Sequence, residues 1–129
     1  MTTVTDAQAG GLRRFNLVMG FVHLIQGFLM LLLSSEFSLP VTSAFLQLDD
    51  ATEALVPVQD TLFDLRIAPL VAVFLFMSAA AHFIISAPGV FEWYRRNLGK
   101  GANYARWIEY AFSSSLMVWI IAMLAGIYD

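Results

Sequence analysis

The chain has 129 residues, of which 59% are hydrophobic and 13% are charged, and its formal net charge is −3. A soluble domain usually carries about 25% charged residues, so this composition excludes an ordinary soluble protein and favours a membrane protein. The absence of cysteine excludes disulfides, thiolate metal sites and thiol nucleophiles, and no run of basic residues suggests a nucleic-acid partner.

Three long apolar stretches predict three transmembrane helices, at about residues 12–34, 67–87 and 104–127. Each stretch is close to the ~20 residues that cross ~30 Å of hydrocarbon as a helix. Helices are expected because backbone exposed to lipid has to satisfy its own hydrogen bonds. The predicted fold is therefore an all-α membrane protein, with residues 1–129 forming a single transmembrane domain.

The two loops between these helices differ in charge. The first, residues 35–66, holds six acids, whereas the second, residues 88–103, holds Arg95, Arg96 and Lys100 against one acid. Cytoplasmic flanks of membrane helices carry an excess of Lys and Arg. We therefore predict a multi-pass cell-membrane protein whose N-terminus and second loop are cytoplasmic and whose first loop is outside.

The first loop contains two short apolar runs, FSLPVTSAFLQLDD and EALVPVQDTLF, separated by a turn candidate around Asp50. Val-, Leu-, Phe- and Thr-rich runs on either side of a turn are typical of a β-hairpin. An irregular loop is the alternative, and the sequence does not choose between the two.

Each predicted helix has one polar face, because residues three, four and seven apart lie on the same side of a helix. The polar residues are Asn16, His23 and Gln26 in the first helix, Ser78 and His82 in the second, and Arg106, Glu109 and Ser113 in the third. Polar faces in a membrane turn toward other protein. Arg106 either belongs to this face or extends to the interface.

His23, His82 and Glu109 also lie at similar depths. At ~1.5 Å of rise per residue, all three fall ~10–16 Å from the inner membrane surface. A single membrane histidine is more often a hydrogen-bonding residue between helices, but an intramembrane acid is a functional-site candidate by default. The shared depth therefore favours one site that contains all three.

The two histidines could belong to a zinc site or to a haem site. A zinc site is not expected, because no HExxH-like spacing is present. His23 and His82 would instead suit a b-type haem in a membrane anchor subunit of a respiratory complex, with Arg106 or Arg96 near the propionates. This alternative explains the histidines and leaves Glu109 unexplained.

A third interpretation begins with RWIEY, residues 106–110. This motif resembles the third-helix signature of microbial rhodopsins, in which the acid is the counterion of a protonated retinal Schiff base. The segments FNLVMGFVHLIQGFLMLLL, FSLPVTSAFL, LFMSAAAHFIISA and RWIEYAFSSSLM are similar to the first three helices of heliorhodopsins. The resemblance covers about residues 12–127, most of the chain.

The resemblance implies a light-sensing photoreceptor that binds all-trans retinal, is not an enzyme, and forms a homodimer partly through the first outer loop. Glu109 would be the Schiff-base counterion, with His23 and His82 in a polar pocket on the inner side. The remaining site residues implied are Ser78 and Ser113 near the Schiff base, and Tyr110, Ser114 and Met117 against the polyene.

Two departures from the rhodopsin pattern matter. Proton pumps of this kind carry a second carboxylate eleven residues after the counterion, where this chain has Ile120, which favours a slow, non-pumping photocycle. The family attaches retinal to a lysine of its seventh helix, whereas the only lysine here is Lys100 in the second loop. The chain is therefore expected to be the N-terminal piece of a longer protein, a truncated gene product or one half of a split assembly, and helices four to seven are needed for the chromophore.

Overall fold

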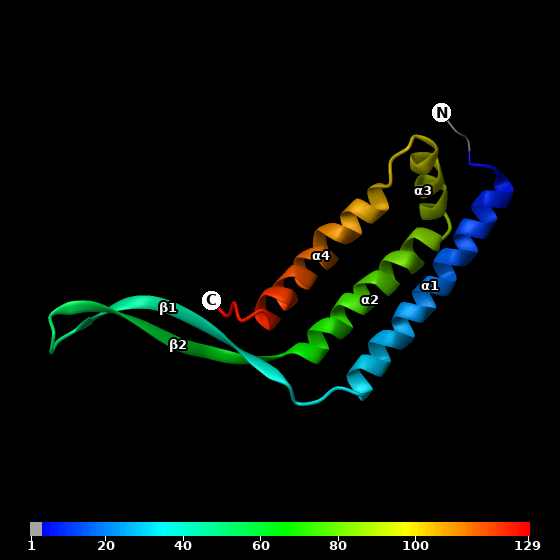
Figure 1. Ribbon diagram of the computed structural model, residues 1–129. Coiled ribbons are helices and arrows are strands. Elements are labelled where there is room, and N and C mark those ends of the chain that lie inside the picture. Colours follow the sequence, from blue (N-terminus) through cyan, green and yellow to red (C-terminus); the bar gives the residue numbers. More distant parts are fainter. Residues whose placement is uncertain (1–3) are drawn as a thin grey trace.

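The computed structural model describes residues 4–129, and within this range it contains four helices and a two-stranded hairpin (Figure 1). In chain order the elements are α1 (Asp6–Leu32), β1 (Ser38–Asp49), β2 (Ala54–Arg66), α2 (Ile67–Ser86), α3 (Val90–Gly99) and α4 (Tyr104–Leu124). Helices α1, α2 and α4 are long and apolar enough to cross a membrane. The prediction of three membrane-spanning helices is confirmed, and the chain is a membrane protein.

Helix α1 begins before its apolar stretch because a capping box closes its N-terminus. The Thr5 hydroxyl accepts a hydrogen bond from the backbone N–H of Gln8 at 3.3 Å, and the Gln8 side chain accepts one from the backbone N–H of Thr5 at 3.0 Å. These two bonds satisfy donors that a helix start otherwise leaves free. The apolar pattern locates the membrane span, whereas the cap decides where the helix starts.

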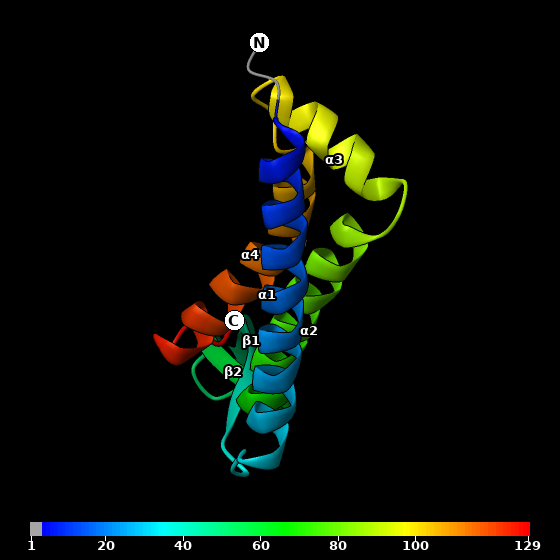
Figure 2. The same ribbon diagram turned by 90° about the vertical axis from the view of Figure 1, so that its right-hand side faces the viewer.

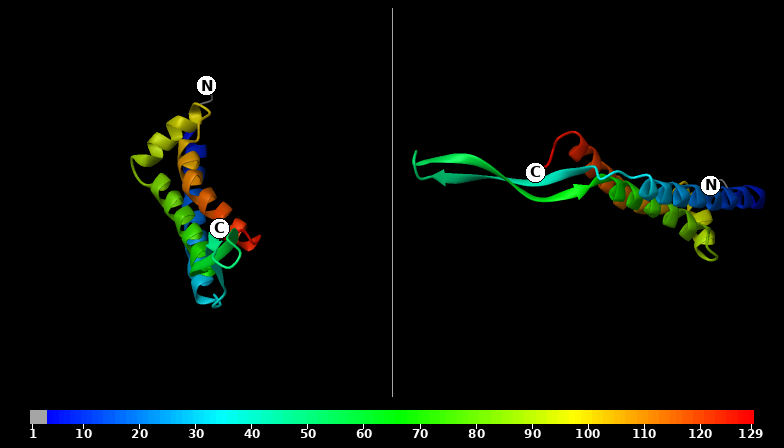
Figure 3. Two further views of the ribbon diagram at one scale, coloured as in Figure 1. Left: turned by 90° about the vertical axis from the view of Figure 1, so that its left-hand side faces the viewer. Right: turned by 90° about the horizontal axis from the view of Figure 1, so that it is seen from below.

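The first loop forms a β-hairpin, as one of the two alternatives predicted. Strands β1 and β2 pair antiparallel from Ser38 opposite Arg66 to Asp49 opposite Ala54. The Asp49 carboxylate closes the turn, because it accepts hydrogen bonds from the Ala51 N–H at 2.9 Å and the Thr52 hydroxyl at 3.0 Å. These bonds, the Ala51 bond foremost, lower the pKa of Asp49. The hairpin extends away from the helices (Figure 3).

The second loop differs from its prediction, because most of it forms the helix α3. Phe91, Tyr94 and Asn97 are its buried residues and lie on one face, at spacings of three. Arg95 holds α3 to α1 through Asp6, with 2.6 Å between the guanidinium and the carboxylate. Only three residues of this 10-residue helix are buried, so its charged sequence lacks the long apolar pattern that marks the other helices. Figure 2 shows α3 lying across the end of the other helices.

Helix α2 lies between α1 and α4 (Figure 1) and packs against both. Gly20 and Gly27 of α1 face Phe83 and Phe76 of α2, and a Cβ added at Gly20 would lie 2.8 Å from Cε1 of Phe83. Small residues let membrane helices approach closely, so these glycines bring the α1 backbone against the phenyl rings of α2. This approach sets which α1 side chains meet α2.

Candidate functional site

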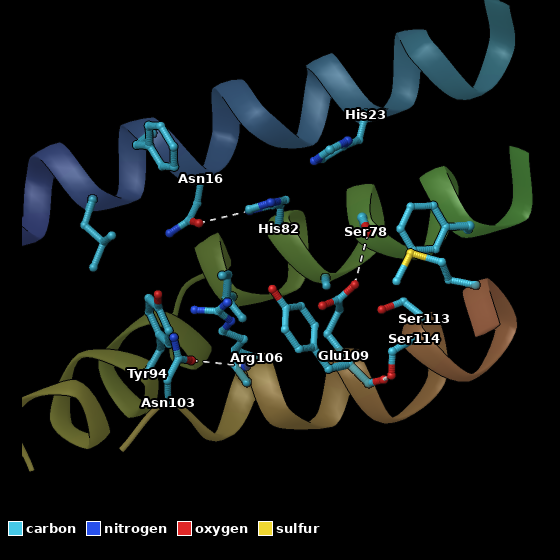
Figure 4. A pocket seen from close by; sticks show the side chains of 18 residues that line it. Asn16, His23, Ser78, His82, Tyr94, Asn103, Arg106, Glu109, Ser113 and Ser114 are labelled. Carbon is cyan, nitrogen blue, oxygen red and sulfur yellow. Dashed lines mark hydrogen bonds between the residues drawn. The ribbon is translucent and has the colours of Figure 1, made fainter. Parts of the chain in front are cut away.

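A cavity of about 590 Å³ lies among α1, α2 and α4, with Tyr94 of α3 and the Asn103 N-cap of α4 at one end (Figure 4). The structure brings all eight residues predicted for the cofactor site to the wall of this one cavity: Glu109, His23, His82, Ser78, Ser113, Tyr110, Ser114 and Met117. They come from three helices because each helix turns its polar face inward.

Glu109 has a hydrogen-bond partner on the neighbouring helix that lines the same cavity. The Ser78 hydroxyl of α2 donates a hydrogen bond to Oε1 of Glu109 at 3.0 Å. Within residues 4–129, no basic side chain forms an ion pair with this carboxylate. Arg106, one turn away, instead places its guanidinium over the Tyr110 ring, 4.8 Å from the centroid. The acid therefore lies in a membrane span without a cationic partner from the described chain.

The two histidines lie side by side in the cavity. Their rings are stacked, with centroids 5.5 Å apart and planes 16° apart. Nδ1 of His82 is 3.0 Å from the Asn16 carboxamide oxygen, and Nδ1 of His23 is 3.2 Å from that of Gln26. A carboxamide oxygen only accepts, so both hydrogen bonds require a proton on Nδ1. In each neutral ring, Nε2 then keeps a lone pair that is available for a proton.

Asn16 is a member of the site that the predicted cofactor set omitted. Its side chain is 4% exposed, and its Nδ2 has no hydrogen-bond partner within the described residues. A buried carboxamide with one satisfied end and one free donor is uncommon in proteins. Its spacing of seven from His23 was the available signal, but spacing alone does not show that it bonds to His82 on another helix.

Tyr94 and Asn103 were missed for a different reason. Both line the cavity, but they belong to the segment predicted as a loop. Asn103 caps α4 by accepting a hydrogen bond from the Arg106 N–H at 3.1 Å. Only the position of α3 across the end of the helices brings Tyr94 to the cavity.

The histidine geometry does not fit the haem alternative. In a haem with two axial histidines, the iron and its macrocycle lie between the two imidazoles. Here the rings are stacked 5.5 Å apart, and the α1 backbone contacts the phenyl ring of Phe83 next to this layer. At this separation the two rings are too close to serve as axial ligands on opposite sides of one iron without a shift of the helices.

Comparison with known proteins identifies the family. A search of curated proteins finds no match to the chain. The family model described as heliorhodopsin matches residues 12–129, which covers α2, α4, α1 from Leu12 onward and every residue of the site described above. Heliorhodopsins are retinal-binding, light-sensing membrane proteins. With the match extending over nearly the whole chain, the protein belongs to the heliorhodopsin family.

Proposed function

We propose that this chain supplies the counterion and the inner polar pocket of a retinal-binding photoreceptor. The observation that carries the proposal is the state of Glu109, which has a hydrogen bond from Ser78 and no cationic partner within residues 4–129. A carboxylate in a membrane span is costly unless a positive group meets it. All-trans retinal, held as a protonated Schiff base, supplies both that positive charge and the absorption of visible light.

The cavity suits such a group in size and lining. Its volume of about 590 Å³ lies within the ~300–1,000 Å³ typical of small-molecule sites. Tyr110, Ser114 and Met117 form an α4 wall for the polyene. The Ser114 hydroxyl already donates to the Tyr110 backbone oxygen. Its proton is therefore not available to other partners, and the wall presents a mainly apolar surface to the polyene. Lys100 does not line the cavity, and we propose that helices four to seven supply the attachment lysine.

The other polar residues of the cavity form two groups, the serines near Glu109 and the two histidines. Ser78 and Ser113 lie near Glu109, and Ser113 is 2% exposed, so they orient and tune the carboxylate. The hydrogen bonds of His23 and His82 to carboxamide oxygens call for the tautomer with a proton on Nδ1 and an acceptor at Nε2. We propose that these two rings take up a proton on the inner side of the cavity.

A slow photosensory cycle without ion transport fits the third membrane span better than a pump. Ile120 stands where a pump would need its second carboxylate, and its side chain is 7% exposed. In the described part of α4, Glu109 is the only acid. We therefore propose that the chain serves light sensing and not transport or enzymatic catalysis.

Absorption spectroscopy with and without retinal tests the proposed function. Coexpression of this chain with helices four to seven of a heliorhodopsin, followed by all-trans retinal, should generate a visible band that neither part gives alone. The measurement is a difference spectrum with and without retinal. A Soret band in the purified chain, abolished by His82→Ala, would contradict the proposal and support haem.

The orientation follows from charge and is a separate proposal. Arg13, Arg14, Arg95, Arg96 and Lys100 gather at the α3 end of the helices, so this end should be cytoplasmic. Glu92 of α3 is exposed and can be labelled once it is replaced by cysteine. Asn97 of the same helix is buried and is therefore unsuitable. Glu92→Cys should resist an impermeant maleimide in intact cells, while Gln47→Cys in the hairpin should react. The reverse pattern would show the opposite orientation.

We propose that the protein forms a homodimer through the hairpin. One face of its outer half is apolar and open, because Leu46, Leu48 and Leu55 are 62%, 57% and 62% exposed and cross-strand partners share a face. Exposed apolar patches mark interaction sites. Leu46→Gln combined with Leu48→Gln should convert dimers to monomers in native mass spectrometry, whereas Phe45→Gln on the opposite face should not. Dimers that persist in the double variant would exclude this surface.

A further inference from the structure

A second groove lies on the other side of the contact between α2 and α4. Its volume is about 320 Å³, and its walls come from α2, α3 and α4. Apart from Glu109, the side chains that line it are apolar or aromatic; they include Ala80, Ile84, Val90, Trp93, Ile108 and Phe112. Ile84, Ile108 and Phe112 are 59%, 58% and 65% exposed. The groove therefore opens on the lateral surface of these two spans.

Helix α3 places positive charge at one end of this groove. Trp93 lines the groove, and Arg96 and the C-cap residue Lys100 follow it at spacings of three and seven, which share a face in helical geometry. Both cations are exposed, and neither forms an ion pair within residues 4–129. Glu92, one turn before Arg96, is likewise without an ion pair in this range.

The position of α3 sets the depth of these charges. It lies across the end of the bundle (Figure 2), directly after α2 and directly before α4. This is where the two membrane spans end, at the level of lipid headgroups. Tryptophan is favoured at that level, and Arg and Lys keep their charged ends there while their stems cover apolar surface.

We propose that the groove binds an acyl chain of an anionic glycerophospholipid whose phosphate is held by Arg96 and Lys100. The apolar walls suit the hydrocarbon chain, and the two unpaired cations suit the phosphate, which Arg binds with paired hydrogen bonds. The net positive charge of this face selects an anionic lipid over a zwitterionic one. Anionic lipids are concentrated in the cytoplasmic leaflet, the side proposed above for α3.

The bound chain would also cover the counterion. Ala81, Ile85, Ala105 and Glu109 line both the groove and the polar cavity, so they form the partition between lipid and site. Two of the four are alanines, which makes the partition thin. An acyl chain in the groove would therefore exclude water from the lipid side of Glu109. This inference does not depend on retinal being bound.

Quenching of Trp93 by brominated lipids tests the proposal. Trp107→Phe with Trp119→Phe leaves Trp93 as the only tryptophan in the otherwise complete chain, reconstituted in phosphatidylcholine vesicles. A small fraction of brominated phosphatidylglycerol should quench Trp93 about thirtyfold more per mole than brominated phosphatidylcholine, as expected for two cations at an anionic headgroup. Soluble glycerol phosphate in excess should not reduce this quenching, which distinguishes a lipid from a free phosphate.

Three variants separate the parts of the site. Arg96→Gln with Lys100→Gln should remove the preference for phosphatidylglycerol. Ala80→Phe, which fills the groove from α2 and leaves the charges in place, should reduce quenching by both lipids. A chain that keeps only Trp119, near the other end of α4, should show no preference. Equal quenching of Trp93 by the two lipids, a preference that survives loss of both cations, or quenching unaffected by Ala80→Phe would overturn the proposal.

Discussion

Glu109→Gln should make the visible band of the reassembled, retinal-bound protein disappear at a lower pH than in the unchanged protein. Glutamine keeps the shape of the side chain and removes its charge. The carboxylate stabilises the protonated form of the chromophore, so its loss favours the deprotonated form, which absorbs in the near ultraviolet. Each ~1.4 kcal/mol of lost interaction moves the pH midpoint down by about one unit. The measurement is a pH titration of dark absorption.

The control variants follow from the partners of Glu109. Ser78→Ala removes the hydroxyl that donates to Oε1 of Glu109 but keeps the charge, so it should move the midpoint less than Glu109→Gln. His82→Phe should leave the dark midpoint nearly unchanged and alter the later photocycle, because a neutral imidazole adds little charge near the chromophore. The titration must be free of halide, since chloride would replace the missing charge. An unmoved midpoint in Glu109→Gln would place the counterion on another helix.

Asn16→Leu should change which nitrogen of His82 carries the proton. In the structure, the Asn16 carboxamide oxygen lies 3.0 Å from Nδ1 of His82, and it holds the proton there because it only accepts. Leucine has a similar size and no acceptor. Leaving a buried donor without its partner costs about 1–3 kcal/mol, so the Nε2-protonated form should rise by roughly tenfold relative to the Nδ1-protonated form. Nitrogen-15 NMR of labelled histidine measures this ratio in the chain without retinal.

Matched variants make the result specific. Asn16→Asp keeps an oxygen acceptor and should preserve the proton on Nδ1 of His82. Gln26→Leu removes the partner of His23 and should change the tautomer of that ring only. In the reassembled protein, Asn16→Leu should slow or reroute the late photocycle while the dark colour stays. If the His82 signals are the same in Asn16→Leu and in the unchanged chain, Asn16 does not position the ring.

The sequence by itself determined the membrane spans and the polar faces. Apolar stretches of this length have no other stable form in lipid than a helix, so composition alone located α1, α2 and α4. The desolvation cost of a carboxylate singled out Glu109, and helical spacing put His23, His82 and Ser78 on inward faces. The resemblance to heliorhodopsins rests on the same stretches, and the family match over residues 12–129 confirms it.

The local sequence pattern did not predict the structure of either loop. The sequence pattern of residues 35–66 is compatible with a hairpin and with an irregular loop. Pairing between strands depends on contacts between residues that are far apart in the chain, so the local pattern does not choose between the two. The same holds for α3, which has few buried residues. Its helix is stabilised by contacts with the start of α1, such as that between Arg95 and Asp6, which no spacing within residues 88–103 reveals.

Only the tertiary structure decided which polar side chains meet. Helical periodicity places a residue on a face, but the rotation and approach of the neighbouring helix select its partner. The fit of Gly20 against Phe83 brings α1 so close to α2 that Asn16 reaches His82 and the two imidazoles stack. The contact between α2 and α4 likewise pairs Glu109 with Ser78, while Arg106 stacks on Tyr110 of its own helix. Packing between helices, which sequence spacing does not encode, therefore leaves Glu109 without a cationic partner within residues 4–129.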